Sequence, residues 1–99
     1  MDDDERLVFC EDMTISREEF LRNLPAAVGH TVIEAAADEF RHRAPGMSWR
    51  IALAALPDLR LGLLALPRFR VRIFLAGYAD ADARRFLDRF ELYFRRGGG

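Results

Sequence analysis

Lysine is absent from this chain, and all fifteen of its basic residues are arginine. The absence excludes chemistry that needs a lysine amine, such as Schiff-base formation or phosphate binding by the lysine of a nucleotide-binding loop. An arginine-only basic set is typical of a GC-rich genome, and the abundance of alanine points the same way. The alternative is selection for planar, bidentate contacts with anions.

Cysteine is nearly absent as well. Cys10 is the one thiol of the chain, so an intramolecular disulfide is excluded and a reducing cytoplasm is the expected location. The N-terminus is acidic and lacks the basic start of a signal peptide. Arginine or proline interrupts every apolar stretch well before the ~18 residues that a membrane-spanning helix needs, so no membrane association is expected.

Net charge is also low, at −1 over 99 residues with 51% hydrophobic and 31% charged residues. This composition is typical of a globular protein, and the length predicts one domain. No overall field attracts nucleic acid or a membrane surface. We expect a flexible acidic leader over residues 1–13, a single α+β domain over 14–96 and a glycine tail over 97–99. Within the leader, the apolar run at 7–10 is either an edge strand or an exposed apolar patch.

A short helix is expected after the leader. Ser16 and Glu19 match a capping box, in which each side chain accepts from the backbone N–H of the other residue. Pro25 disfavours helical geometry at the residue before it, which predicts a helix end near Asn23. Two turns do not persist alone, so this helix must be held by packing.

The stretch over residues 28–43 supports two interpretations. Val32, Ile33, Ala36 and Phe40 recur at helical spacing, and local propensity favours a helix by a narrow margin. The β-branched residues from Thr31 onward favour strands instead. Two strands here would extend the central sheet to four or five strands, and the sequence leaves both interpretations open.

The central stretch from 49 to 77 alternates apolar and polar residues and carries Pro57 and Pro67. We interpret it as a meander of three antiparallel strands, broken at the two prolines. Odd-numbered residues such as Ile51 and Ile73 are expected to face the core, and even-numbered ones to face outward. A two-residue turn at Pro57 would scramble this pattern, so an odd loop or a β-bulge is expected, with Gly62 as a candidate bulge residue.

A long amphipathic helix is predicted to begin at Asp80 or Asp82 and to continue to the arginines at 95–96. Its aromatic stripe, which includes Phe90, is expected to lie across the apolar face of the sheet. The predicted fold is therefore α+β: a short N-terminal helix, an antiparallel meander of three to five strands, and a long C-terminal helix packed on one sheet face.

The outer sheet face is the one candidate functional surface. Its expected members are arginines with two apolar neighbours: Arg50, Arg60, Arg70, Arg72, Leu64 and Phe74. Adjacent like charges cost energy unless acids or a bound anion offset them. Three interpretations of this face are therefore open. It is a solvated surface whose arginines pair with acids of the N-terminal segment, a binding site for an anion or a nucleic acid, or a surface that a second subunit covers. Phe74 alone is available for base stacking, which disfavours nucleic acid.

No catalytic, metal or cofactor signature is present. His30 and His42 stand twelve residues apart without cysteine or acid at ligand spacing, and Cys10 has no neighbouring base. We expect a non-enzymatic interaction module that forms a homodimer. The alternative is an anion or nucleic-acid binder that uses the arginines. A remote alternative is a carrier activated at the carboxylate of Gly99.

Overall fold

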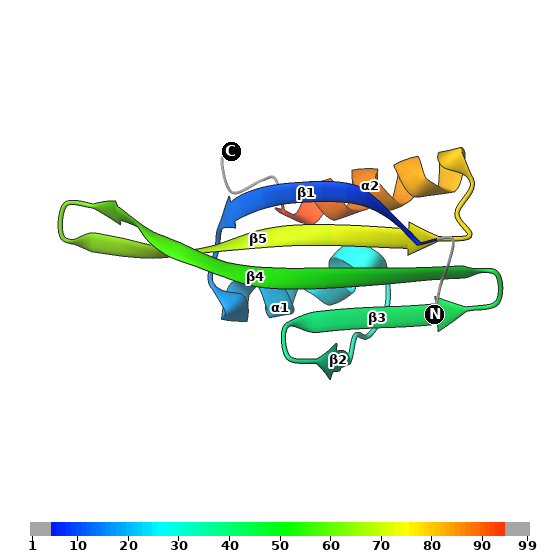
Figure 1. Cartoon of the computed structure of the whole chain (residues 1–99), viewed down its shortest axis with the longest axis horizontal. Helices are drawn as coiled ribbons and strands as arrows, with labels where there is room; N and C mark the ends of the chain where they lie inside the picture. Colours follow the sequence, from blue (N-terminus) through cyan, green and yellow to red (C-terminus); the bar gives the residue numbers. More distant parts are fainter. Residues whose placement is uncertain (1–4, 95–99) are drawn as a thin grey trace.

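A computed structural model describes residues 5–94 of the chain (Figure 1). Its elements in order are β1 (Arg6–Thr14), α1 (Arg17–Val28), β2 (Glu34–Ala36), β3 (Glu39–Ala44), β4 (Met47–Leu61), β5 (Leu64–Ala76) and α2 (Asp80–Phe94). The strands form one antiparallel sheet in the order β1-β5-β4-β3-β2. This confirms the predicted α+β class with five strands and two helices.

The N-terminal part of the sheet corrects one expectation. Residues 6–13, assigned to a flexible leader, lie in β1, which pairs with β5 along its length. The apolar run at 7–10 is therefore part of an edge strand, because its backbone groups find partners on β5. Residues 1–4 and the glycine tail at 97–99 lie outside the described residues.

Helix α1 starts as predicted and ends later. The Ser16 hydroxyl oxygen accepts from the Glu19 N–H at 3.0 Å. The predicted end near Asn23 is wrong, because the helix continues to Val28 with Pro25 inside it. Pro25 carries no N–H of its own, but its carbonyl accepts from the N–H of the capping residue Gly29 at 2.8 Å. Buried side chains on either side of the proline hold this last turn in place.

The helix interpretation of residues 28–43 is wrong, and the strand interpretation is confirmed by β2 and β3. The tight turn between them contains Asp38 at φ 58°, a conformation that aspartate tolerates. Arg17 of α1 braces this turn, with Nη2 2.6 Å from Glu34 Oε2 and Nε 2.7 Å from Asp38 Oδ1. Pairing with β4 and this brace outweigh the helical propensity of the alanines.

The three-strand meander over 49–77 is also wrong, since the stretch forms only β4 and β5. The turn lies at Gly62–Leu63, where Gly62 has φ 63° at the first central position of a two-residue hairpin. The register shifts between Leu56 and Leu59, so that residues 57–58 oppose Pro67. The predicted bulge therefore exists, but at Pro57 rather than at Gly62.

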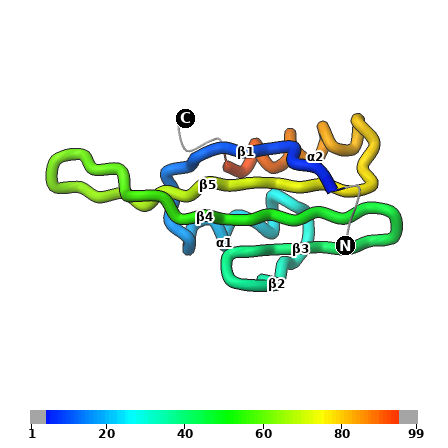
Figure 2. The backbone as a smooth tube through the Cα atoms, in the orientation of Figure 1, coloured from blue at the N-terminus to red at the C-terminus, as the bar shows by residue number. Residues whose placement is uncertain are grey.

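The distal part of this hairpin, residues 56–66, projects beyond the rest of the sheet (Figure 2). We call it the arm. Strand β1 pairs with β5 as far as Arg68, and β3 pairs with β4 as far as Ala52. The arm therefore has no neighbouring strand among the described residues.

Both helices lie on the same face of the sheet, behind it in Figure 1. Between helices and sheet lies one core of buried side chains: Phe9, Phe20, Leu24, Ala27, Phe40, Trp49, Ile51, Leu53, Val71, Ile73, Leu75, Ala83 and Phe90. The predicted core face, with Ile51 and Ile73 inward, is confirmed. Phe90 is fully buried, with its ring 5.4 Å from that of Phe9 and 4.5 Å from that of Phe94. No helix among residues 5–94 has the length and apolar character needed to cross a membrane.

Candidate interaction surface

The sheet face opposite the helices, which we call the outer face, has no helix or strand packed on it among residues 5–94 (Figure 1). Side chains alternate along a strand, so the even-numbered residues of β5 point to this face while the buried odd-numbered ones point to the core. The outer face therefore carries Arg70, Arg72 and Phe74 from β5. Their register partners on β4 are Ala54, Ala52 and Arg50, in the same order.

Arg50 is held by two acids and an aromatic ring. It donates to both carboxylate oxygens of Glu5, at 3.0 Å from Nε and 2.9 Å from Nη2, and from Nη1 to Glu39 at 2.9 Å. Its guanidinium carbon lies 3.9 Å from the ring centroid of Phe74. The hydrogen bonds from Arg50 lower the pKa of Glu5. This arginine is therefore neutralised inside the fold.

Arg70 has a partner of the same kind. Its Nε and Nη2 donate to the two oxygens of Asp12, at 2.8 and 3.2 Å, and Arg68 lies 3.7 Å from the same carboxylate. These hydrogen bonds lower the pKa of Asp12. Glu5 immediately precedes β1, and Asp12 lies within it. The expectation that acids of the N-terminal segment partner the arginines is confirmed for Arg50 and Arg70.

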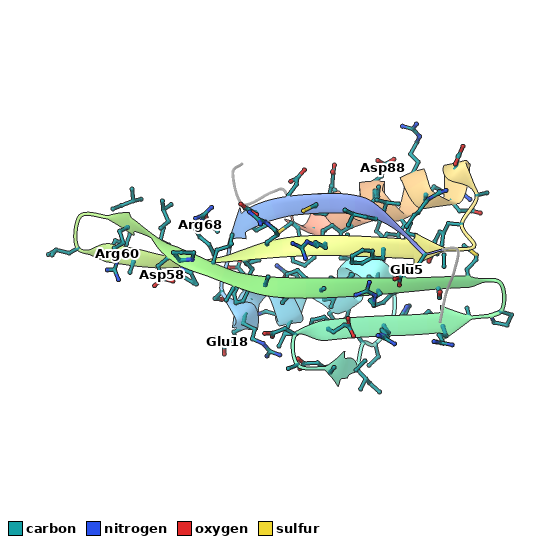
Figure 3. The ribbon with its side chains drawn as sticks, in the orientation of Figure 1. Glu5, Glu18, Asp58, Arg60, Arg68 and Asp88 are labelled. Atoms are coloured by element: carbon teal, nitrogen blue, oxygen red, sulfur yellow. The ribbon has the colours of Figure 1, made fainter. Side chains whose placement is uncertain are left out.

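The other two arginines of the predicted row are separated. Arg72 is exposed on the outer face and forms no ion pair with any residue from 5 to 94. Arg60 lies on the arm with Asp58, away from the other three (Figure 3). The four arginines thus do not form one continuous cationic row.

A second surface, which the sequence analysis missed, lies on the arm. Cross-strand partners share a face of a sheet, and the pairs Leu59–Leu66 and Leu61–Leu64 put four leucines on one face of the arm. We call these four residues the leucine face. Leu59, Leu61 and Leu64 are 38%, 57% and 55% exposed. A hairpin turn placed at Gly62 would have revealed this alternation in the sequence.

The opposite face of the arm is different. The pair between the two leucine pairs is Arg60–Ala65, whose side chains point the other way. Leu63 lies at the tip of the arm and is fully exposed. The arm is therefore an amphipathic two-stranded ribbon.

The leucine face continues the outer face of the sheet. Along β5, Leu64 and Leu66 belong to the same even-numbered series as Arg68, Arg70 and Arg72. On β4, the extra residue of the bulge at 57–58 switches the odd-numbered leucines from the core side to this side. Leu64 and Phe74, the two apolar residues expected beside the arginines, therefore lie on one continuous surface.

Such an arm needs support from elsewhere. An isolated two-stranded hairpin is at best marginally stable in water. Next to the base of this arm, the Ile15 N–H donates to the Pro67 carbonyl at 3.0 Å. Large exposed apolar side chains on an otherwise unsupported ribbon are typical of a surface that another chain covers.

Two further features were not visible in the sequence. His30 and His42 lie in contact, with ring centroids 4.1 Å apart and ring planes tilted by 40°, and both rings pack near Trp49. Within residues 5–94 no group of three metal-ligating side chains is present, so we interpret this cluster as aromatic packing. A hollow of about 330 Å³ beside it is lined by Arg41, Arg43 and other residues of β3 and β4.

Comparisons with protein-family models, with curated proteins and with solved structures found no match for this chain. The features that bear on function are therefore the outer face and the leucine face of the structure.

Proposed function

We propose that this chain is a non-enzymatic interaction module that self-associates as a homodimer. The observation that carries the proposal is the leucine face on an unsupported arm, continuous with an uncovered sheet face. The charged part of that surface is largely satisfied within the fold, whereas the apolar part is not. The single cysteine, Cys10, is exposed, which suits a reducing compartment such as the cytoplasm.

The apolar surface of the arm supplies much of the free energy that a dimer of moderate affinity needs. The exposed leucines of the arm together expose about as much surface as two to three free leucine side chains. At ~1.5–3 kcal/mol for each fully buried side chain, their burial on both copies contributes on the order of 10 kcal/mol. Association costs about 4–15 kcal/mol in lost freedom of motion. We therefore expect a dissociation constant in the micromolar range, with further contacts beyond the arm.

Sedimentation velocity on the full chain tests this proposal. A dilution series from about 100 µM to 1 µM spans the expected dissociation constant, so the sedimentation coefficient should fall from the dimer value toward the monomer value. A monomer throughout this range would overturn the proposed self-association.

An anion or nucleic-acid binder is the second candidate. Two observations favour it: Arg72 has no ion pair among the described residues, and three arginines, Arg41, Arg43 and Arg50, line one hollow together with the acid Glu5. Binding of single-stranded nucleic acid that weakens steeply with salt, and that is lost in Arg70→Ala/Arg72→Ala, would support it. Unchanged binding in that double variant would remove it. For the remote carrier hypothesis, deleting residues 98–99 should abolish activation of the chain, and the homodimer proposal expects no effect.

A further inference from the structure

We infer that two copies join arm to arm and antiparallel, with leucine face on leucine face, so that the tip of each arm covers Leu56 at the base of the other. This inference rests on the proposed self-association and adds to it the surface, the occupant and the orientation. The occupant of the leucine face is a second copy of this chain.

The leucine face is complementary to itself. A two-fold dimer uses the same patch on both copies, so the patch must tolerate its own approach. Leu59, Leu61, Leu64 and Leu66 carry no charge, and their contact would create no like-charge pair. The charged residues of the arm are placed elsewhere: Arg60 points to the opposite face, with Asp58 near it (Figure 3). They would stay in water when two leucine faces meet.

Charge at the base of the arm selects the antiparallel orientation. Arg68 follows Leu66 on the same face of β5, and Arg70 follows Arg68. Both arginines share the Asp12 carboxylate, so the three groups keep a net positive charge. If two arms lay parallel, this charge would meet its own copy at the base, which is unfavourable. In the antiparallel orientation, the base of each arm instead meets the uncharged tip of the other, at Leu63.

The extent of the contact selects the same orientation. Within the arm, β4 contributes six residues and β5 contributes three, so the ribbon is at most about 20 Å long, which is short for an interface that should bury about 1,000 Å² in total. Antiparallel overlap adds contact beyond the leucine face, because Leu56 lies on the outer face at the base of each arm. There it would meet Leu63 of the other copy, which is fully exposed at the tip.

A matched pair of variants tests the surface. Leu64→Asn places an amide on the leucine face, whereas Ala65→Asn places the same amide on the opposite face of the same strand. Because each copy in the dimer loses a leucine contact, Leu64→Asn should raise the dissociation constant on the order of a hundredfold. Ala65→Asn should change it by less than about threefold, within the usual range for a surface substitution. Both positions lie outside the core, and circular dichroism checks that each variant is folded.

Crosslinking tests the orientation. In a Cys10→Ser background, a short bismaleimide that spans the ~10 Å between packed sheets should join copies of a Leu63→Cys/Leu56→Cys double variant. Neither single variant should crosslink efficiently, because like positions lie far apart in the antiparallel dimer. Efficient tip-to-tip crosslinking of Leu63→Cys alone would overturn the antiparallel orientation.

The possible outcomes separate this inference from the proposed function. A monomeric wild-type chain removes both. A wild-type dimer that Leu64→Asn leaves unchanged overturns the arm as the interface, and self-association then stands on another surface. A dimer weakened equally by Leu64→Asn and Ala65→Asn also overturns it, because a leucine-face contact requires the two variants to differ. A dimer weakened by Leu64→Asn alone, with crosslinking in the double variant only, supports the inference in full.

Discussion

Gly77, at the end of β5, offers a sharp test of how the sheet is assembled. It has φ 79°, a conformation in which an L side chain costs roughly 1–2 kcal/mol. A Cβ at this position would overlap the carbonyl oxygen of Gly46 and lie 2.9 Å from its carbonyl carbon. The turn between β3 and β4 would have to move, and forced overpacking of this kind costs about 1–3 kcal/mol more. We therefore expect Gly77→Ala to lower the free energy of unfolding by about 2–5 kcal/mol.

Urea unfolding of Gly77→Ala and of Gly62→Ala measures the two contributions separately. Gly62 also has positive φ, at 63°, but an added Cβ there meets nothing within 4 Å. Gly62→Ala should therefore show only the backbone cost of roughly 1–2 kcal/mol. In a domain of this size, 1 kcal/mol corresponds to about 4–8 °C in Tm, so thermal unfolding should separate the two variants clearly. Equal destabilisation of both would show that Gly77 does not lie against the turn, and the packing argument would fail.

Two further predictions concern the core and the ion pairs of the outer face. Phe90→Ala should lower the free energy of unfolding by about 3–5 kcal/mol in chemical denaturation, because the ring is fully buried. The control variant Leu92→Ala, at a mostly exposed position, should lower it by under about 1 kcal/mol. A decrease below about 1 kcal/mol for Phe90→Ala would show that Phe90 is not part of the core. Hydrogen bonds from arginine lower the pKa of Glu5 and of Asp12 in the folded state. These two ion pairs therefore stabilise the fold above about pH 4.5, and the stabilisation is lost as the pH falls through the folded pKa values of the two carboxyl groups. The Tm should therefore fall between pH 7 and pH 3, and the fall should be smaller in Arg50→Gln than in the wild-type chain. An equal fall in the two proteins would contradict the ion pair between Arg50 and Glu5.

Local periodicity explains what could be predicted from the sequence. The stripe that predicted α2 and the alternation that placed Ile51 and Ile73 in the core both depend on residues close together in the chain. The capping box at Ser16 is equally local. Such signals survive folding because tertiary contacts reinforce them.

Two of the wrong predictions, the early end of α1 and the three-strand meander, share one cause, which is that the local sequence does not show the surroundings of a proline. Pro25 was expected to end α1, and Pro57 and Pro67 were expected to separate strands. In the structure Pro25 lies within the last turns of a packed helix, and the other two face each other at a bulge. A proline at a bulge, in a part of a strand with no neighbour, forfeits few ladder hydrogen bonds. That situation depends on strand pairing, which the local sequence does not specify.

Long-range pairing also bears on the two hypotheses for the outer face. The sequence leaves open whether Arg50 and Arg70 are paired, because their partners, Glu5 and Asp12, lie 45 and 58 residues away. Once paired, these arginines gain little from an external anion, since a new ligand must replace existing charge-assisted hydrogen bonds. The leucine face has no such internal partner among the described residues, so its burial gains the full hydrophobic contribution. The same fold that satisfies the charges thus leaves the apolar arm as the part of this surface for which a second chain offers the larger gain.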